Sequence, residues 1–404
     1  MKVLALTDYS RRTAFGLQMD YLLNGLSSEH QCALIGWGHT GDEIENRGSY
    51  MLFPAMGDFG NQSLIPAIQM FKPDVLLTMA DSRMISWMAQ LKGNLPTWVN
   101  YPVIDGHVWD IENKQTKWPS EWVEFMKLAD YTVAHSRFSQ TLLRANYITT
   151  DYIPHMIDVN IFKPLPQEIR NQIKANLGIP ANSFVVGFNF KNMMRKQPDK
   201  FLQILALLRK EEKNIVGLVH TNISRQFGGE FEIPNIAKDY GLEANKDIFA
   251  TPVGMPYPQM NLWYNALDCY LAPVGGESFQ VPLIEAMAAG VPIATSNYTT
   301  APEICGDCAE LIDVPTYLGT NVPITFGSYM GVEFVIPDIF DAKRRVLKLY
   351  RNKELREEYI MKASEKVLKT YSVEVVIPQW KKFMRKTEGL EDLPEEWKSK
   401  LGLQ

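Results

Sequence analysis

Two glutamates, Glu277 and Glu285, flank a point in the chain where a strand should give way to a helix. The apolar run before them has strand character and stops at Gly275-Gly276, and a helical stretch follows until Gly290. A loop of this kind leaves backbone N–H groups unpaired at the positive end of the helix, where phosphate binds readily. The pattern therefore predicts a phosphate site framed by two carboxylates. The alternative is an ordinary strand-turn-helix with two solvated glutamates.

Basic residues supply a second group of chemically suitable side chains. Arg195 and Lys196 directly precede a long amphipathic helix, and Lys191 lies a few residues before them. Cations near a helix start are disfavoured by the helix dipole unless an anion is bound there. This position favours a bound anion over simple solvation.

The stretch around the two glutamates resembles the signature of family 4 glycosyltransferases, which are retaining enzymes that use nucleotide sugars. Seven residues separate Glu277 from Glu285, as in that signature. The resemblance implies that Glu277 holds hydroxyls of the donor sugar and that Glu285 holds the ribose of the nucleotide. The implied donor loop, whose amides would meet the diphosphate, comprises Gly276, Ser278, Phe279, Gln280 and Val281. Ser278 and Gln280 stand where the family usually has glycine.

The same family carries an arginine and then a lysine that pair with the donor diphosphate. Lys196 matches the lysine, and either Lys191 or Arg195 takes the place of the arginine. The resemblance further implies that the leaving phosphate accepts the acceptor's proton while the cationic loop stabilises the departing diphosphate. No Asp-x-Asp cluster is present to hold a metal ion. We therefore expect neither a metal ion nor another cofactor.

Two loops of the N-terminal half are further candidates. Gly16 is the single match to the glycines that the family carries in its first loop, and we assign it to donor binding. Arg11 and Arg12 beside it suit either an anionic acceptor or a solvated loop. The loop after residues 97–104 contains Asp105 and His107, one of which the resemblance places near the reacting carbon. A structural role for the histidine is equally open.

Strands alternate with helices along the chain, which predicts parallel sheets covered on both faces. Ligands of such sheets bind beyond the carboxyl ends of the strands. Three prolines within residues 152–166 indicate a linker. Residues 38–63 are rich in glycine and polar residues, and 313–337 resist assignment.

These features predict an α/β chain of the GT-B type, with two Rossmann-like, doubly wound domains facing a central cleft. Residues 1–165 form the acceptor-side domain, and residues 166–370 form the domain that binds the nucleotide sugar. A helical segment, 371–404, returns to the first domain, as the C-terminal helix of the family often does.

Composition narrows the class of protein. The chain has 404 residues, of which 46% are hydrophobic and 22% charged, and its net charge is −5, so bulk charge does not indicate a nucleic-acid partner. No apolar run reaches the ~18 residues of a membrane span, and the first apolar run is too short for a signal peptide. Four scattered cysteines fit a reducing cytoplasm, with Cys305 and Cys308 as unremarkable thiols or a metal or redox pair.

The function expected is transfer of a hexose from a nucleoside diphosphate sugar to an unidentified hydroxyl acceptor, with retention of configuration. Two alternatives stay open. One is an isomerase of similar fold, such as a nucleotide-sugar 2-epimerase, and the other is a non-catalytic nucleotide-binding scaffold.

Overall fold

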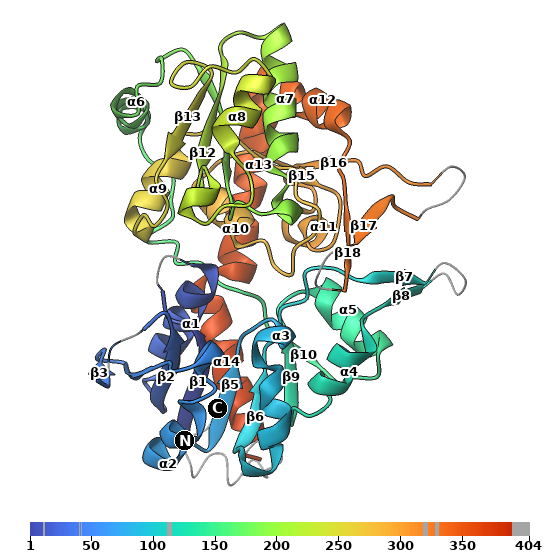
Figure 1. The fold of residues 1–404 in the computed structure, drawn as a ribbon. Helices are drawn as coiled ribbons and strands as arrows, with labels where there is room; N and C mark the ends of the chain where they lie inside the picture. The colour runs from blue at the N-terminus through green and yellow to red at the C-terminus, as the bar shows by residue number, and fades with distance from the viewer. Residues whose placement is uncertain are drawn as a thin grey trace.

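The structure is a computed structural model that describes residues 1–10, 13–39, 41, 43–110, 115–317, 322–327 and 331–389. It consists of two large sheets, each covered by helices, and two small two-stranded sheets, with one domain below the other in Figure 1. Arg11 and Arg12, and residues 390–404 of the expected C-terminal segment, lie outside the described residues.

The first sheet has the order β10-β9-β6-β5-β1-β2-β4-β3 and is parallel except for the β3–β4 pair. Its central strand β1 is buried along five consecutive residues, because helices cover both faces of the sheet. Its strands are β1 (Lys2–Asp8), β2 (Gln31–Trp37), β3 (Glu45–Asn46), β4 (Tyr50–Pro54), β5 (Val75–Thr78), β6 (Thr97–Asn100), β9 (Tyr131–Ala134) and β10 (Asp151–Tyr152).

The helices of this domain fall on two faces. Buried side chains of α1 and α14 pack on one face, and those of α2 and the 3₁₀ segment η2 pack on the other. Their bounds are α1 (Ala14–Leu26), α2 (Leu64–Phe71), α3 (Ser82–Ile85), η2 (Ser86–Asn94), α4 (Ser120–Met126) and α5 (Arg137–Ala145), with the hairpin β7 (Val108–Asp110) and β8 (Gln115–Lys117).

The second sheet is parallel throughout, with the order β13-β12-β11-β14-β15-β16. Its strands are β11 (Phe184–Asn189), β12 (Ile215–His220), β13 (Ile248–Thr251), β14 (Cys269–Ala272), β15 (Ile293–Ser296) and β16 (Glu310–Ile312). Its helices are α6 (Gln167–Asn176), α7 (Pro198–Glu211), α8 (Ile233–Asp239), α9 (Tyr257–Asn265), α10 (Val281–Ala288), α11 (Ala301–Cys305), α12 (Ile339–Arg351) and α13 (Lys353–Lys366).

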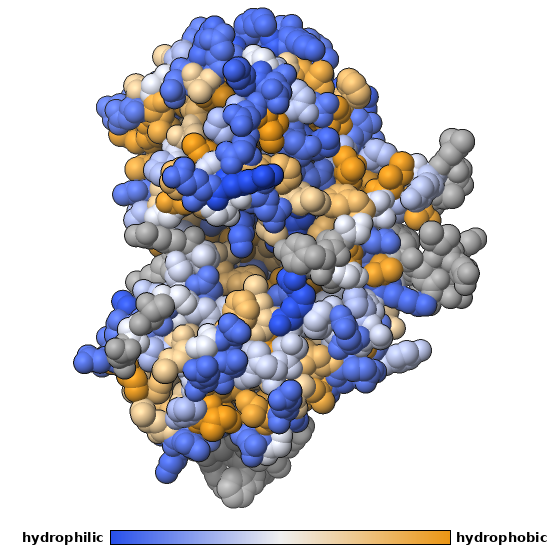
Figure 2. Space-filling view, in the orientation of Figure 1, coloured by the Kyte–Doolittle hydropathy of each residue, from blue (hydrophilic) through white to orange (hydrophobic). Residues whose placement is uncertain are grey.

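Two features connect the domains. Helix α14 (Val373–Thr387) returns to the first domain, where Trp380 and Met384 are fully buried against α1 and the sheet. An arm, formed by the described residues of 313–338, leaves the second sheet after β16 and carries β17 (Thr325–Gly327) and β18 (Glu333–Val335) down to the first domain (Figure 1). The space-filling view in Figure 2 shows a hollow on this face where the two domains meet.

The observed elements agree with the alternation that the sequence predicts. The main omission lies in residues 38–63, where β4 extends the first sheet and pairs in parallel with β2. The run YMLFP is short and surrounded by glycine and polar residues, so its strand character depends on the neighbouring strand rather than on its own pattern.

Candidate active site

The glycine loop and helix α10 form one wall of the space between the domains. Strand β14 ends at Ala272, and α10 begins at Val281 with no side-chain cap from Gln280. Within the described chain, the amides of Phe279 and Gln280 make no hydrogen bond. The side-chain oxygen of Gln280 is also buried without a partner. A buried helix end that lacks a cap is well suited to an anionic ligand.

Four charged side chains meet beside this loop. Glu277 pairs with Arg195 at 2.6 Å and with Lys196, and both cations lie in the 3₁₀ turn η3 (Met194–Lys196) before α7. Arg195 also pairs with Asp105 of the first domain at 3.2 Å. The four side chains are all at least 86% buried. We call this group the charge network.

The local field gives these groups different acidities. Burial by itself raises the pKa of Glu277, but Arg195 and Lys196 outweigh that effect and hold the pKa below its usual range. Burial raises the pKa of Asp105, and the adjacent cation Arg195 only partly offsets this. Burial lowers the pKa of Lys196, which Glu277 opposes. An arriving dianion would compete with Glu277 for the two cations.

Asp105 and His107, the two candidates from the first domain, occupy different places. Asp105 belongs to the charge network and accepts the backbone N–H of Ser278 at 3.1 Å. His107 packs instead against Phe138 and Tyr298, with ring centroids 5.7 Å away in both cases. Burial lowers the pKa of His107 to about 4. The geometry favours Asp105 as the residue nearest the donor loop.

Glu285 lies in the middle of α10 and is 5% exposed. One of its carboxylate oxygens accepts a hydrogen bond from the Tyr264 hydroxyl at 2.6 Å. In the described structure no cation lies within ion-pair distance of it, and burial raises its pKa to about 7. A carboxylate buried this way is stabilised by a ligand that donates hydrogen bonds, such as a ribose diol.

Ser278 joins the two domains where a glycine would have no side chain to do so. Its hydroxyl accepts the backbone N–H of Ile104 at 2.7 Å and forms a hydrogen bond with the imidazole of His135. His135 stacks on His155, and Phe279 packs edge-on against that second ring. The donor loop is therefore seated on buried groups of the first domain.

The remaining candidates from the sequence are placed as follows. Gly16 lies in the first turn of α1, where a Cβ would overlap the carbonyl oxygen of Ser10, so the close approach of the preceding loop requires glycine at this position. Lys191 is exposed and takes no part in the charge network, whereas Arg195 does. Of Lys191 and Arg195, the geometry favours Arg195 as the second cation beside Lys196.

Residues that the sequence did not single out complete the contact between domains and hold the Glu277 loop. Glu303 of α11 accepts the backbone N–H groups of Arg137 and Phe138, at the start of α5, at 2.7 and 3.2 Å. The Tyr152 hydroxyl also donates to Glu303 at 3.2 Å. Thr299, just before α11, accepts the backbone N–H of Glu277 at 3.1 Å. No local motif marks these residues, because their partners lie more than a hundred residues away or in an irregular loop.

Other features of the described chain that bear on function do not belong to the charge network. A pocket of about 770 Å³ lies at the amino ends of β11, β12 and β13, away from the charge network, and its lining includes Lys210 and Lys213. Within the described ranges no three His, Cys, Asp or Glu side chains could together hold a metal ion. In the same ranges no helix has both the length and the apolar composition of a membrane span. Cys305 and Cys308 are buried free thiols.

Comparison with known proteins places the donor loop in a recognised sequence pattern. Residues 184–316 match the family described as "Glycosyl transferases group 1". D-inositol 3-phosphate glycosyltransferase of Thermobispora bispora is 27% identical over 143 residues, which are 35% of this chain and 33% of that protein. Its counterpart in Saccharomonospora viridis is 29% identical over 168 residues, or 40% and 37% of the two chains. The chain thus spans about a third of the length of these relatives.

Solved structures resemble the whole fold. Sucrose-phosphate synthase from Thermosynechococcus elongatus has a TM-score of 0.72 at 14% identity, covering 96% of this chain and all of the other. Anabaena HepE, solved in complex with UDP and glucose, has a TM-score of 0.66 at 15% identity, with 96% and 100% coverage. The α/β fold of GT-B type that the sequence predicts is confirmed, and the group 1 glycosyltransferase pattern lies in its second domain.

Proposed function

We propose that this protein is a glycosyltransferase that moves a hexose from a nucleoside diphosphate sugar to a hydroxyl acceptor, with retention of configuration. The observation that carries the proposal is the charge network. Arg195 and Lys196 pair with Glu277, which lies four residues before the uncapped start of α10. Two cations with a helix N-terminus suit a diphosphate, and an adjacent carboxylate suits sugar hydroxyls.

Each of these residues would bind a different part of the donor. Lys196 and Arg195 would bind the diphosphate together with the unpaired amides of Phe279 and Gln280. Glu277 would then turn from the cations to the hydroxyls of the hexose. Glu285, which no cation of the described residues neutralises, would hold the ribose. Each assigned contact is consistent with the charge of that side chain in the ligand-free structure.

The reaction would take place on one face of the sugar. The acceptor oxygen bonds to the anomeric carbon as the bond from that carbon to the diphosphate oxygen breaks, and the acceptor's proton passes to the leaving diphosphate. Negative charge grows on the diphosphate during this step, so Lys196 and Arg195 stabilise the transition state more than the bound donor. We assign this role to the two cations and to α10 without a metal ion, and a chelator should leave the rate unchanged.

The donor nucleotide is best sought first among uridine diphosphates, since five of the similar solved structures, three of them of HepE, are complexes with UDP or UDP-glucose. The acceptor would lie against the first domain, outside the family match to residues 184–316.

The test is to incubate the protein with a panel of nucleotide sugars and to follow the release of nucleoside diphosphate and free sugar. Slow hydrolysis of one donor, insensitive to chelator, is the expected result. An isomerase would convert the nucleotide sugar without releasing diphosphate. A scaffold would bind nucleotide without consuming any donor. Either of these outcomes would refute the proposal.

A further inference from the structure

Strand β18 of the arm lies between the Asp105 loop and the Glu277 loop, which carry the two carboxylates of the charge network. Its first residue, Glu333, donates its backbone N–H to the carbonyl of His107 in the first domain at 2.9 Å. Its last residue, Val335, donates its backbone N–H to the carbonyl of Gly275, directly before the donor loop, also at 2.9 Å. Gln197, which follows Lys196, donates its side-chain amide to the carbonyl of Val335. A single short strand thus contacts the loops on both sides of the cleft.

The residue between these two, Phe334, fills the space where the loops face each other. Its ring is 2% exposed, and side chains in a strand alternate, so it points away from the face that Glu333 and Val335 share. A Cβ on Gly276 would lie 3.0 Å from the ring and 2.6 Å from the carbonyl oxygen of Asp105. A Cβ on Gly106 would lie 3.4 Å from the ring and 2.8 Å from the carbonyl oxygen of Glu333.

This packing explains why two positions in the loops are occupied by glycine. Gly106 comes from the first domain and Gly276 from the second, and each would crowd both the Phe334 ring and a backbone oxygen if it carried a side chain. Phe334 and Val332 also belong to one buried cluster with Ile104 and other apolar residues of the first domain. The ring therefore acts as a spacer in a close-packed interface, where even small shifts are felt.

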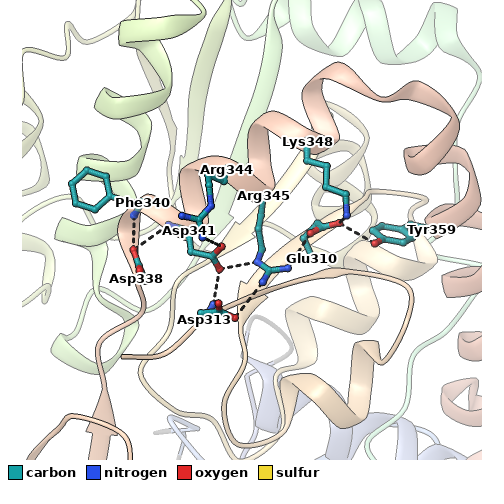
Figure 3. A network of polar contacts seen from close by, with 9 residues as sticks. All are labelled: Glu310, Asp313, Asp338, Phe340, Asp341, Arg344, Arg345, Lys348 and Tyr359. Carbon is teal, nitrogen blue, oxygen red and sulfur yellow. Dashed lines mark hydrogen bonds and ion pairs between the residues drawn. The ribbon is translucent and has the colours of Figure 1, made fainter. Parts of the chain in front are cut away.

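The base of the arm is fixed to the second domain (Figure 3). Asp338 donates its backbone N–H to the carbonyl of Asp313 at 2.9 Å, which brings the two ends of the arm together. Asp313 donates its own N–H to the buried Asp341 at 2.7 Å. Arg345 links that carboxylate to Glu310 of β16, at 2.7 and 3.2 Å. The arm that carries Phe334 is therefore anchored to the second sheet.

We propose that Phe334 is a positioning residue for the transfer reaction: its ring sets the separation of the Asp105 loop and the Glu277 loop, so that the Asp105–Arg195 pair of the charge network forms only when β18 is seated on the first domain. The kinetic part of this inference rests on the proposed glycosyltransferase function. The structural part does not, because the contacts exist without a donor.

The structural part is tested by amide hydrogen exchange on the full chain without nucleotide. Phe334→Leu keeps an apolar side chain, and Phe334→Ala removes most of it. Exchange should rise at least about tenfold, together, in peptides covering 104–107 and 275–280, and more for alanine than for leucine. The matched control is Phe326→Leu, because Phe326 is half-buried in the same hairpin and its ring lies 5.9 Å from that of Phe334.

Exchange that rises only within 331–335, or equally in the Phe326 variant, would overturn the coupling. In kinetics, Phe334→Leu should lower donor turnover by at least about tenfold while the UDP dissociation constant stays within about threefold, since a small misplacement affects chemistry more than binding. Unchanged turnover alongside raised exchange would show that the spacing does not matter for the reaction. A wild-type protein that consumes no nucleotide sugar would refute the proposed function, and the exchange result would still decide whether Phe334 couples the loops.

Discussion

Replacing Glu285 with glutamine should make the ligand-free protein more stable, and increasingly so as the pH rises. Glu285 is buried, its only hydrogen-bond donor in the described structure is the Tyr264 hydroxyl, and its pKa is raised to about 7. The folded state therefore holds this proton more tightly than the unfolded state does. Between the ordinary carboxyl range and about pH 7 the folded state binds more protons, so stability falls as pH rises through that window.

The size of the effect follows from the shift. A pKa raised from 4.5 to about 7 corresponds to about 3 kcal/mol at 1.36 kcal/mol per unit, of which about 2.5 kcal/mol develops between pH 5 and pH 8. Glutamine keeps an oxygen for Tyr264 and has no charge to bury. The melting temperature of the variant should exceed that of the wild type by about 5–10 °C more at pH 8 than at pH 5, if the second domain unfolds as one unit.

Thermal melts of both proteins at the two pH values measure this difference, and the other titrating groups cancel between them. Glu243→Gln is the matched control, because Glu243 is exposed and pairs with Lys246 on the surface. The same glutamine variant should lose affinity for UDP-glucose, whereas wild-type affinity should rise from pH 6 to pH 8 as the carboxylate ionises. UDP-glucose is the better ligand, because the terminal phosphate of UDP itself titrates at about pH 6. A stability difference that did not change with pH would refute the reasoning.

Two further predictions concern the charge network and the domain contact. Lys196→Ala should lower turnover by about 10²–10³-fold, more than it weakens donor binding, because charge on the diphosphate grows as the sugar leaves. Lys191→Ala, at an exposed position outside the network, should have no effect in the same steady-state assay. A change in the Michaelis constant alone would make Lys196 a ground-state contact. Glu303→Gln should lower the free energy of unfolding by about 1 kcal/mol in urea titrations, because the start of α5 loses a carboxylate. Asp307→Asn changes an exposed acid that pairs with Lys362 in its own domain, and it should leave the free energy of unfolding unchanged. Equal effects of the two substitutions would argue against a specific contact.

The donor loop was predictable because its signals are local. Gly275-Gly276, the apolar run before them and the proline at the start of α10 specify strand, loop and helix within about twenty residues, and the two glutamates fall inside that unit. Arg195 could not be separated from Lys191 in the same way. The distinction depends on a turn at η3 that directs one side chain toward Glu277 and leaves the other in solvent.

Contacts between the domains could not be predicted from the sequence, for a different reason. Asp105 and His107 are two residues apart and equally plausible as chemistry, yet only Asp105 meets Arg195. Phe334 lies in a stretch whose short alternation is weak evidence for any element, and its role comes from Gly106 and Gly276, which lie far from it in the chain. Ser278 departs from the expected glycine, and its bonds to the first domain give that departure a physical purpose.

The most direct test of the central claim is a pair of measurements on Glu277→Gln, which keeps the size of the side chain but removes its charge. In the structure Glu277 occupies the two cations that we assign to the diphosphate. Calorimetry should therefore show UDP binding as tight as in the wild type, or tighter, while hydrolysis of the intact donor falls by about 10²-fold or more because the sugar is no longer held in place. A variant that lost UDP affinity yet turned over a saturating donor at the wild-type rate would contradict the assignment of Glu277 to the sugar.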